Sequence, residues 1–324
     1  MKSNDELLDQ LDATFKSITG ISQLGESVLA AEQFDRFVEA MMARTNILPN
    51  ARFIDMSAHQ VNIDRIGFTG RVLTGGLDKD SANQGTSEDW VNATTATNKL
   101  RAVELRGKVA LEDRALRRNI ERGNFQQHLV DLFGQAAGRD FEEWAILANS
   151  AYGVTDILKL GDGWAKKSGN IIYGGDGAFD PDDAEEVLEA LLDALPKQYL
   201  INRAEWEFQV PYEIENGYRD ILKARGTALG DAALTTGGKL MYKGIPVVYC
   251  PMLERSKSVE ENGAGRIAML QHPDNMVWGV FHEVTIEAKR DAENRRTEFY
   301  LTIECDAHYE DEKAAVVAFL DQSS

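Results

Sequence analysis

Two long runs of alternating residues flank a polar, glycine-bearing segment, and this stretch constrains the fold more than any other. The first run spans residues 61–75, and the second, 103–111, places its valines and leucines on one face. At about 3.3 Å per residue the first strand would span roughly 50 Å and the second roughly 30 Å, whereas a compact body of this chain length has a radius of gyration of about 20 Å. Because a two-stranded hairpin is marginally stable alone in water, we predict that it overhangs the body and packs its apolar face on another copy of the chain.

Charge and hydropathy restrict what the chain can bind. The 324 residues include 53 acidic and 35 basic side chains, which gives a net charge of −18. This charge disfavours direct binding of nucleic acid, although a closed shell can enclose nucleic acid without a basic groove. No apolar run approaches the ~20 residues of a membrane span, and residues 1–6 turn acidic instead of leading into a signal peptide. We expect a folded protein that stays in a cytoplasm and has no membrane partner.

Patterns that would indicate catalysis, a cofactor or a metal are incomplete. The segment 161–168 resembles a phosphate-binding loop, but Lys166 stands where the second glycine belongs. His282 and Glu283 lack the second histidine of a zinc-binding helix. The aspartates within 176–183 lack the glycine and final glutamate of a calcium loop, so we interpret them as helix caps. We predict no catalytic, cofactor-binding or metal-binding residue, and no enzymatic activity.

The cysteines and histidines support the same interpretation. Cys250 and Cys305 fall inside apparent strands without metal-type spacing, which is typical of small buried hydrophobic residues rather than of a disulfide or redox pair. The five histidines are scattered along the chain, and no serine or cysteine occupies a nucleophile elbow.

Residue spacing also predicts elements outside the hairpin. A capping box at 3–6 begins a short amphipathic helix, and a second helix follows near 30–45. A long helix is expected over 124–149, and Asp180 with Pro181 begins another that extends to residue 195. The remaining predictions are strands at 198–202 and 205–210, a helix at 211–224, a strand pair near 243–250, a hairpin of 284–288 with 299–307, and a last strand at 314–320 that closes this hairpin.

Several segments of the carboxyl-terminal half follow one another in a distinctive order. After the helix over 181–195 come Tyr199-Leu200-Ile201-Asn202-Arg203-Ala204-Glu205-Trp206, Gly244-Ile245-Pro246-Val247-Val248, Leu301-Thr302-Ile303-Glu304-Cys305 with Ala307-His308-Tyr309, and Ala314-Ala315-Val316-Val317. With the arm, hairpin and long helix that precede them, these segments resemble the major capsid proteins of tailed bacteriophages over nearly the whole chain. No single segment is specific, so the resemblance rests on their order and spacing.

The resemblance implies an α+β fold of the Hong Kong 97 type, with an amino-terminal arm, an extended β-hairpin loop, a long spine helix, and peripheral and axial domains. Carried over, it assigns 1–50 to the arm, 51–112 to the extended loop and flanking strands, 113–180 and 282–324 to the peripheral domain, and 181–281 to the axial domain.

The resemblance and the hairpin pattern together imply that the loop lies over an adjacent subunit. The predicted subunit contacts are Leu7, Leu11 and Phe15 in the arm, Ile66, Phe68, Val72, Leu77 and Trp90 in the loop, and Val103, Leu105 and Val109 in the second alternating run.

Two departures from the family affect assembly. Some members join subunits through an isopeptide bond between a loop lysine and an asparagine; Lys79 could supply the lysine, but residues 295–307 contain no asparagine, so we expect no crosslink. Some members also carry a cleaved amino-terminal scaffold of ~100 residues, whereas only about 60 residues precede the loop here. We therefore expect a separate scaffolding protein, or none.

The resemblance implies a shell subunit that forms the hexamers and pentamers of an icosahedral head around double-stranded DNA. Its implied partners are identical subunits, a scaffolding protein, a portal and, where present, a decoration protein, and its implied location is the virion, with assembly in the host cytoplasm. Two alternatives stay open: an encapsulin-like bacterial nanocompartment shell that encloses an enzyme, and a soluble enzyme with an unrecognised site.

Overall fold

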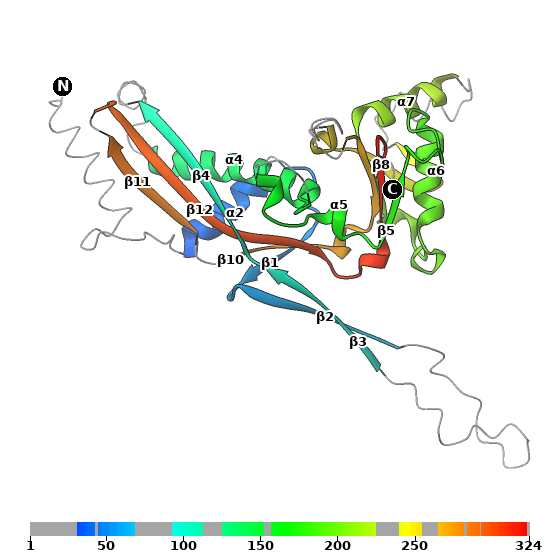
Figure 1. Cartoon of the computed structure of the whole chain (residues 1–324), viewed down its shortest axis with the longest axis horizontal. Coiled ribbons are helices and arrows are strands. Elements are labelled where there is room, and N and C mark those ends of the chain that lie inside the picture. Colours follow the sequence, from blue (N-terminus) through cyan, green and yellow to red (C-terminus); the bar gives the residue numbers. More distant parts are fainter. Residues whose placement is uncertain are drawn as a thin grey trace, which may run out of the picture.

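The structure is a computed structural model that describes residues 31–42, 45–68, 93–112, 125–151, 157–224, 240–254, 265–281, 284–291 and 293–322. These residues form two bodies, each built on a β-sheet, and a narrow two-stranded ribbon that projects away from both (Figure 1). The predicted helix after residue 3 and the predicted loop tip lie outside the described residues.

The first body is organised by one long strand that has partners on both of its edges. This strand, β12, pairs antiparallel with β10 near its carboxyl end and with β11 and β4 along its amino-terminal part. A further strand, β1, pairs parallel with β10. The bounds are β1 Arg52–Met56, β4 Val103–Glu112, β10 Met276–Phe281, β11 Thr285–Asp291 and β12 Arg296–Tyr309.

The strand over 103–111 belongs to this sheet, so its predicted pairing with the first run of the hairpin is wrong. β4 aligns with β12 from Val103 opposite Cys305 to Glu112 opposite Arg296. The ribbon instead consists of β2 (Gln60–Phe68) and β3 (Ala93–Arg101), which are antiparallel. The error has a physical cause: the apolar alternation of β4 fits the covered face of a sheet, whereas the threonine-rich β3 shows no such alternation.

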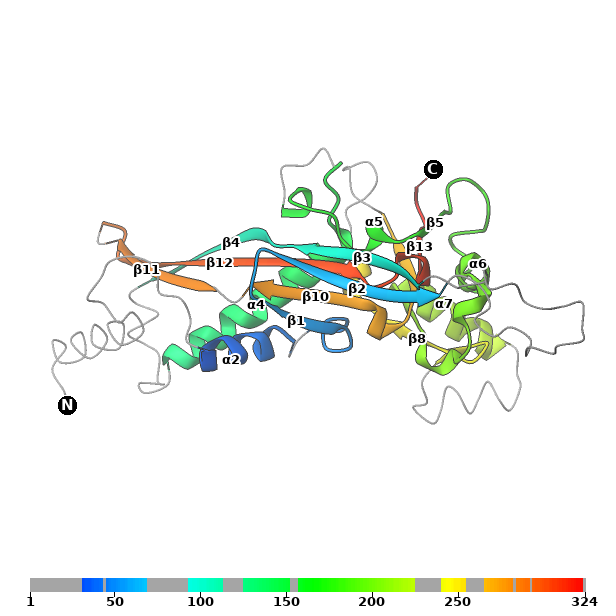
Figure 2. The same ribbon diagram turned by 90° about the horizontal axis from the view of Figure 1, so that it is seen from below.

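Two helices cover one face of this sheet. α4 (Phe125–Leu147) confirms the predicted long helix, and its 23 residues span about 34 Å. It contacts the sheet through aromatic pairs: the ring centres of Phe133 and Phe299 lie 5.7 Å apart, and those of Phe141 and Trp278 lie 5.6 Å apart. The shorter helix α2 (Ala31–Met42) packs on α4 beside the sheet (Figure 2).

The second body contains a six-stranded sheet with the order β5-β13-β9-β6-β8-β7. Helices α6 and α7 bury their apolar sides against one face of this sheet, whereas its other face contributes to the core of the first body. The bounds are β5 Asn170–Tyr173, α6 Ala184–Ala194, β6 Glu207–Val210, α7 Tyr212–Ala224, β7 Met241–Tyr242, β8 Ile245–Tyr249, β9 Ile267–Gln271 and β13 Ala315–Phe319, with the short helix α5 Trp164–Lys167 before β5.

Some of the helices and strands predicted for this body are confirmed, and others are wrong. The helix before residue 195 is confirmed, but its predicted start at Asp180 and Pro181 is wrong, because α6 begins at Ala184. The cap is Asp183, which accepts hydrogen bonds from the N–H groups of Glu185 and Glu186 at 2.8 and 3.3 Å. The predicted strand at 198–202 is wrong, because residues 197–199 form a single 3₁₀ turn. The last strand, β13, exists but pairs with β5 and β9 instead of closing the carboxyl-terminal hairpin.

The strand pairing refines the domain boundaries that the sequence suggests. β10 lies within 181–281 but pairs in the first sheet, while β5 and β13 lie outside that range and pair in the second. The division into peripheral and axial domains stays a prediction. We propose that its axial part comprises residues 170–271 together with 315–319.

Both cysteines are buried, with 1% of Cys250 and none of Cys305 exposed, and neither forms a disulfide bond. Burial raises the pKa of the Cys305 thiol well above its usual value. The interpretation of both residues as small hydrophobic side chains is therefore confirmed. Among the described residues, no helix is both long enough and apolar enough to cross a membrane.

The crossing of α2 and α4 depends on two glycines. A Cβ at Gly138 would lie 2.3 Å from the carbonyl oxygen of Met41, and one at Gly134 would lie 2.6 Å from Cβ of Ala40. We expect Gly138→Ala to lower the free energy of unfolding by about 1–3 kcal/mol from overpacking, even though alanine favours a helix by about 1 kcal/mol.

Urea unfolding of the purified subunit measures this effect, and Gly217→Ala in α7 is its control. A Cβ at Gly217 would meet only Cβ of Ala184, at 3.4 Å, so that substitution should raise the stability by up to about 1 kcal/mol. Equal stabilities for the Gly138 variant and the wild type would contradict the close helix crossing.

A buried carboxylate fixes the segment after α2. Glu142 is 1% exposed, and its Oε1 accepts hydrogen bonds from the N–H groups of Asn46 at 2.9 Å and Ile47 at 2.6 Å. Burial raises the pKa of Glu142 above its usual value of 4.5, although these N–H groups oppose the shift. The carboxyl group of Glu142 therefore holds its proton more tightly in the folded chain than in the unfolded chain. As a result, its contribution to the free energy of unfolding falls as pH rises from about 4.5 through the raised pKa.

We expect Glu142→Gln, which keeps a carbonyl acceptor without the charge, to lose this part of the pH dependence while retaining the fold. Glu142→Ala should instead lower the free energy of unfolding by about 1–3 kcal/mol, because it leaves buried N–H groups without an acceptor. Urea unfolding at pH 5, 6 and 7 compares the variants. Parallel curves for the wild type and Glu142→Gln would show that Glu142 contributes no such dependence.

Candidate assembly surfaces

The ribbon is the part of the described chain that is least covered by the rest. β2 and β3 pair over nine residues each, from Gln60 opposite Arg101 to Phe68 opposite Ala93, a length of about 30 Å. The base and the middle of the ribbon contact the body, because Arg65 and Asn98 bind residues 309–311, whereas the far end of the ribbon projects away from it (Figure 1).

The described surface of the ribbon is mainly polar. The side chains of Asn62, Asp64, Thr95, Thr97 and Lys99 are exposed. The apolar pair near the base, Ile63 and Leu100, is buried inside the same chain with Met56 and Val277. The structure does not describe the side chains of Ile66 and Phe68 in β2, so the contact of an apolar ribbon face with a partner stays a prediction.

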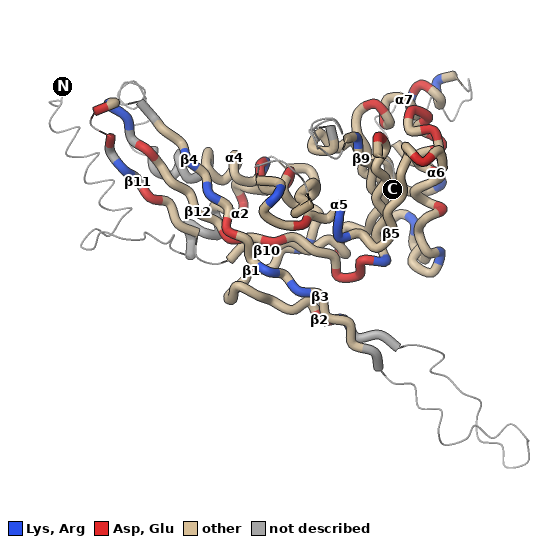
Figure 3. The backbone as a smooth tube through the Cα atoms, in the orientation of Figure 1, with Lys and Arg blue, Asp and Glu red and all other residues tan. Residues whose placement is uncertain are grey.

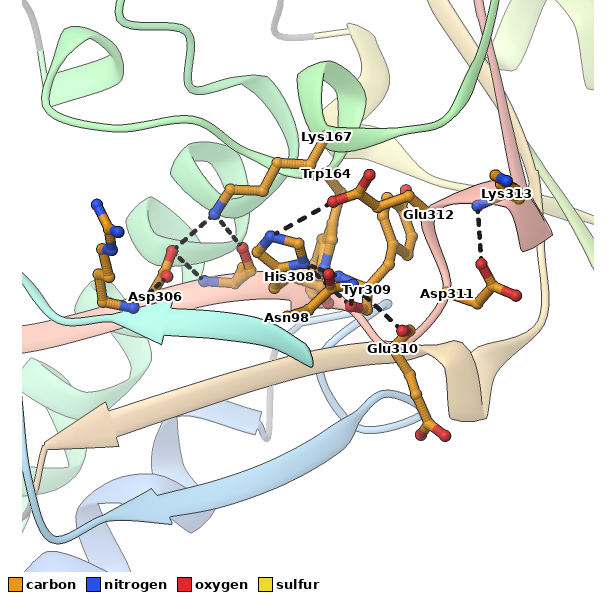
Figure 4. A network of polar contacts seen from close by, with 12 residues as sticks. Asn98, Trp164, Lys167, Asp306, His308, Tyr309, Glu310, Asp311, Glu312 and Lys313 are labelled. Atoms are coloured by element: carbon orange, nitrogen blue, oxygen red, sulfur yellow. Dashed lines mark hydrogen bonds and ion pairs between the residues drawn. The ribbon is translucent and has the colours of Figure 1, made fainter. Parts of the chain in front are cut away.

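Hydrogen bonds to the end of β12 hold β3 in place (Figure 4). The carboxylate of Asp306 accepts a hydrogen bond from the N–H of Arg101 at 2.7 Å and another from Nζ of Lys167 at 3.0 Å. Asn98 donates from Nδ2 to the carbonyl oxygens of Tyr309 and Glu310 at 2.9 and 3.2 Å. Asp306 is 4% exposed, so its charge is neutralised inside the protein by Lys167 rather than by solvent.

His308, two residues after Asp306, is held in place by hydrogen bonds with its neighbours. Nδ1 of His308 accepts a hydrogen bond from the N–H of Tyr309 at 2.9 Å, and Trp164 donates from Nε1 to the carbonyl oxygen of His308 at 2.9 Å. Burial, followed by the charge of Lys167, lowers the pKa of His308 below its usual value of 6.5. The imidazole is thus mostly neutral at neutral pH, and its contact with Glu312 at 3.8 Å is not an ion pair there.

A second surface is the outer face of β4, β12 and β11, opposite α4, which we call the charged sheet face. Basic and acidic residues follow each other along these strands (Figure 3). Arg106 pairs with Glu104 at 2.5 Å, and Nζ of Lys108 lies 5.9 Å from the ring centre of Tyr300. The hydroxyl of Tyr300 donates to Glu298 at 2.7 Å, and this bond, followed by the bond from Arg296, lowers the pKa of Glu298. This face offers charge pairs and hydrogen-bonding groups rather than apolar area.

The structure separates the predicted contact residues into several groups. Leu7, Leu11, Phe15, Val72, Leu77 and Trp90 lie outside the described residues, and Ile66 and Phe68 lie in β2 with side chains that the structure does not describe. Leu105 is buried in the core of its own chain, and Val103 packs against that core. Val109, at 41% exposure, is the predicted contact that the described surface presents.

We call the contacts of Asp306 with Arg101 and Lys167, and of Asn98 with the backbone of residues 309–310, the ribbon anchors. Sequence patterns did not reveal them. Asp306 lies 205 residues from Arg101 and 139 from Lys167 along the chain, so no local spacing links these partners. The one available signal is an aspartate of β12 between the buried Cys305 and Ala307, where strand alternation turns its side chain to the opposite face of the sheet.

The acidic segment 176–183 carries no metal-site geometry. Asp180 accepts a hydrogen bond from the N–H of Asp182, and Asp182 pairs with Arg266 at 2.8 Å. The interpretation as capping is therefore confirmed for Asp183, whereas Asp180 closes a turn before the helix and Asp182 forms an ion pair. Within the described ranges, no group of histidine, cysteine or carboxylate residues is arranged to hold a metal ion.

Comparison with known proteins identifies the fold. No family model matches the sequence. The chain is 25% identical over 316 residues to the putative prophage capsid protein YqbE of Bacillus subtilis (strain 168), covering 96% of each chain. It superposes on a chain of the satellite phage P4 procapsid that includes the size determination (Sid) protein with a TM-score of 0.60, at 12% identity, covering 98% of this chain and 97% of that one. For the capsid of Myoviridae phage XM1 the TM-score is 0.51, at 11% identity, covering 83% and 89%.

These similarities confirm the predicted resemblance to tailed-phage capsid proteins and the Hong Kong 97-type fold class. They also support the expected structural role without enzymatic activity.

Two lysine–aspartate pairs test how strongly burial matters at the ribbon anchor. Lys167–Asp306 and Lys197–Asp193 both measure 3.0 Å, but the aspartate side chains are 5% and 68% exposed. We expect Asp306→Ala to lower the free energy of unfolding by about 3 kcal/mol, because it leaves a mostly buried ammonium and an N–H without their acceptor. Asp193→Ala should change it by less than about 0.5 kcal/mol.

Chemical unfolding of both variants, monitored by tryptophan fluorescence, measures the difference. Similar effects of the two substitutions would mean that the Asp306 network does not anchor the strand.

Proposed function

We propose that this protein is the major capsid protein of a tailed phage, and that it assembles into the hexamers and pentamers of an icosahedral head around double-stranded DNA. The observation that carries the proposal is a ribbon that projects from the body on an anchored base, in a chain similar along 96% of its length to a prophage capsid protein. A self-contained soluble enzyme gains nothing from such a projection.

In this proposal the ribbon lies across the adjacent subunit, and the charged sheet face supplies part of the surface that receives it. The exposed threonine and lysine side chains of β3 match a face carrying Glu104, Arg106 and Lys108. Each hydrogen bond of this kind contributes only about 0.5–1.5 kcal/mol, so a stable shell requires the contact to be repeated around every capsomer.

The charge of the chain suits confinement of DNA rather than adhesion to it. A net charge of −18 repels phosphates, so the shell would hold its contents by closure. We propose that a separate scaffolding protein and a portal guide this closure, and that assembly takes place in the host cytoplasm. A nanocompartment shell with an enzyme cargo is the alternative with less support.

The strand register allows a clean test of the role of the loop. Phe68 and Ala93 are opposite each other, so residues 69–92 can be replaced by Asn-Gly, which favours the tight turn of a two-residue hairpin. We expect this variant to fold with an unfolding midpoint within a few degrees of the wild type, because the ribbon anchors remain. It should nevertheless fail to form shells, because the proposal assigns to residues 69–92 the contact with the neighbouring subunit.

Negative-stain microscopy and sedimentation velocity measure assembly, with circular dichroism as the check on folding. Shells of normal size and yield from the shortened variant would overturn the proposed role of residues 69–92 in assembly. Wild-type shells filled with a co-purified enzyme and free of DNA would instead favour the nanocompartment, and a wild-type chain without shells would contradict both.

A further inference from the structure

The chain passes between the two sheets three times, and hydrogen bonds join these connections near residues 310–315. The turn from β9 to β10 contributes Asn275, whose Nδ2 donates to the carbonyl oxygens of Asp311 and Ala314 at 3.0 and 3.2 Å. The link from α5 to β5 contributes the N–H of Gly169, which donates to the carbonyl oxygen of Glu312 at 2.8 Å. Motion of one body relative to the other would therefore act on this junction as well as on the core that the two sheets share.

The side chain of Asp311, shown in Figure 4, lies in this junction and is bound by donors from three parts of the molecule. Nη1 of Arg65 on the ribbon donates to Oδ2, and the hydroxyl of Tyr199 in the second body donates to the same atom at 2.8 Å. The N–H of Lys313, in the connection between the sheets, donates to Oδ1 at 3.2 Å. The carboxylate is 10% exposed, so solvent is a poor substitute for any of these donors.

A shared acceptor atom makes its two donors interdependent. A carboxylate that shifts toward Arg65 moves away from Tyr199, and the loss of either bond leaves a mostly buried charge less well neutralised. On the other strand of the ribbon, Asn98 binds the backbone directly before Asp311. Both strands of the ribbon are thus tied to the segment that connects the two sheets.

We propose that Asp311 is a positioning residue that couples the direction of the ribbon to the loop 196–206 of the second body. Displacement of the ribbon pulls Arg65 and the carboxylate, and the carboxylate moves Tyr199 and its loop. The statement that a neighbouring subunit causes the displacement rests on the proposed function, whereas the coupling itself is a property of the single chain.

Distance measurements on the unassembled subunit test the coupling without reference to shell formation. Spin labels at Thr95→Cys on the ribbon and Arg139→Cys on α4 report the direction of the ribbon relative to the first body, because both positions are exposed. The natural cysteines are buried and accept no label. The decisive variant is Tyr199→Phe, which removes one hydroxyl from the second body and leaves the ribbon itself unchanged.

We expect a narrow distance distribution for the doubly labelled wild type, and a broadened or shifted one for Tyr199→Phe and for Asp311→Asn. The control is Asp64→Asn, a ribbon aspartate bound only locally by Thr97 at 2.7 Å, which should leave the distribution unchanged. A label pair at Thr95→Cys and Asn202→Cys reports the loop. If Tyr199→Phe alters the Thr95–Asn202 distance but not the Thr95–Arg139 distance, Tyr199 holds only its own loop in place. That result would overturn the proposal.

Discussion

Backbone pairing along β12 is the constraint on which the rest of the structure depends. Its 14 residues span about 46 Å, and it has hydrogen-bonded partners on both edges over most of that length. The apolar side of β12 and its neighbours faces α4, and its carboxyl end leads directly into the second sheet through residues 310–314. The helices, the ribbon and the second body all take their positions from this one strand.

The ribbon shows how a projection can be held firmly and still remain soluble. Among the ribbon side chains that the structure describes, the large buried apolar ones are Ile63 and Leu100, which pack with Met56 and Val277 near the base. Beyond the base, the described side chains are small or charged. A projection with an exposed apolar stripe would invite pairing between free subunits in solution, whereas a polar one needs a complementary surface in a defined place.

The sequence predicted the elements whose caps and hydrophobic periodicity lie within a short window of residues. The helix before residue 195 has its cap and apolar stripe within a short window, and the long helix and carboxyl-terminal hairpin follow equally plain periods. The pairing of β4 was missed because alternation reveals that a strand has a covered face, not which strand lies beside it. Asp306, Asp311 and their partners were missed for a related reason, since their bonds join residues more than a hundred positions apart. The overall family resemblance succeeded because order and spacing integrate many weak local signals.

In the shell that we propose, the polar side chains described on the ribbon have a kinetic consequence for assembly. Contacts made of a few solvent-exposed hydrogen bonds and charge pairs break quickly when they are incomplete, so a wrongly seated copy departs before others can trap it. Only a copy that satisfies several contacts at once stays long enough to be enclosed. A surface of this composition corrects its own errors during growth, and such growth should be sensitive to ionic strength because salt shortens the lifetime of every partial contact.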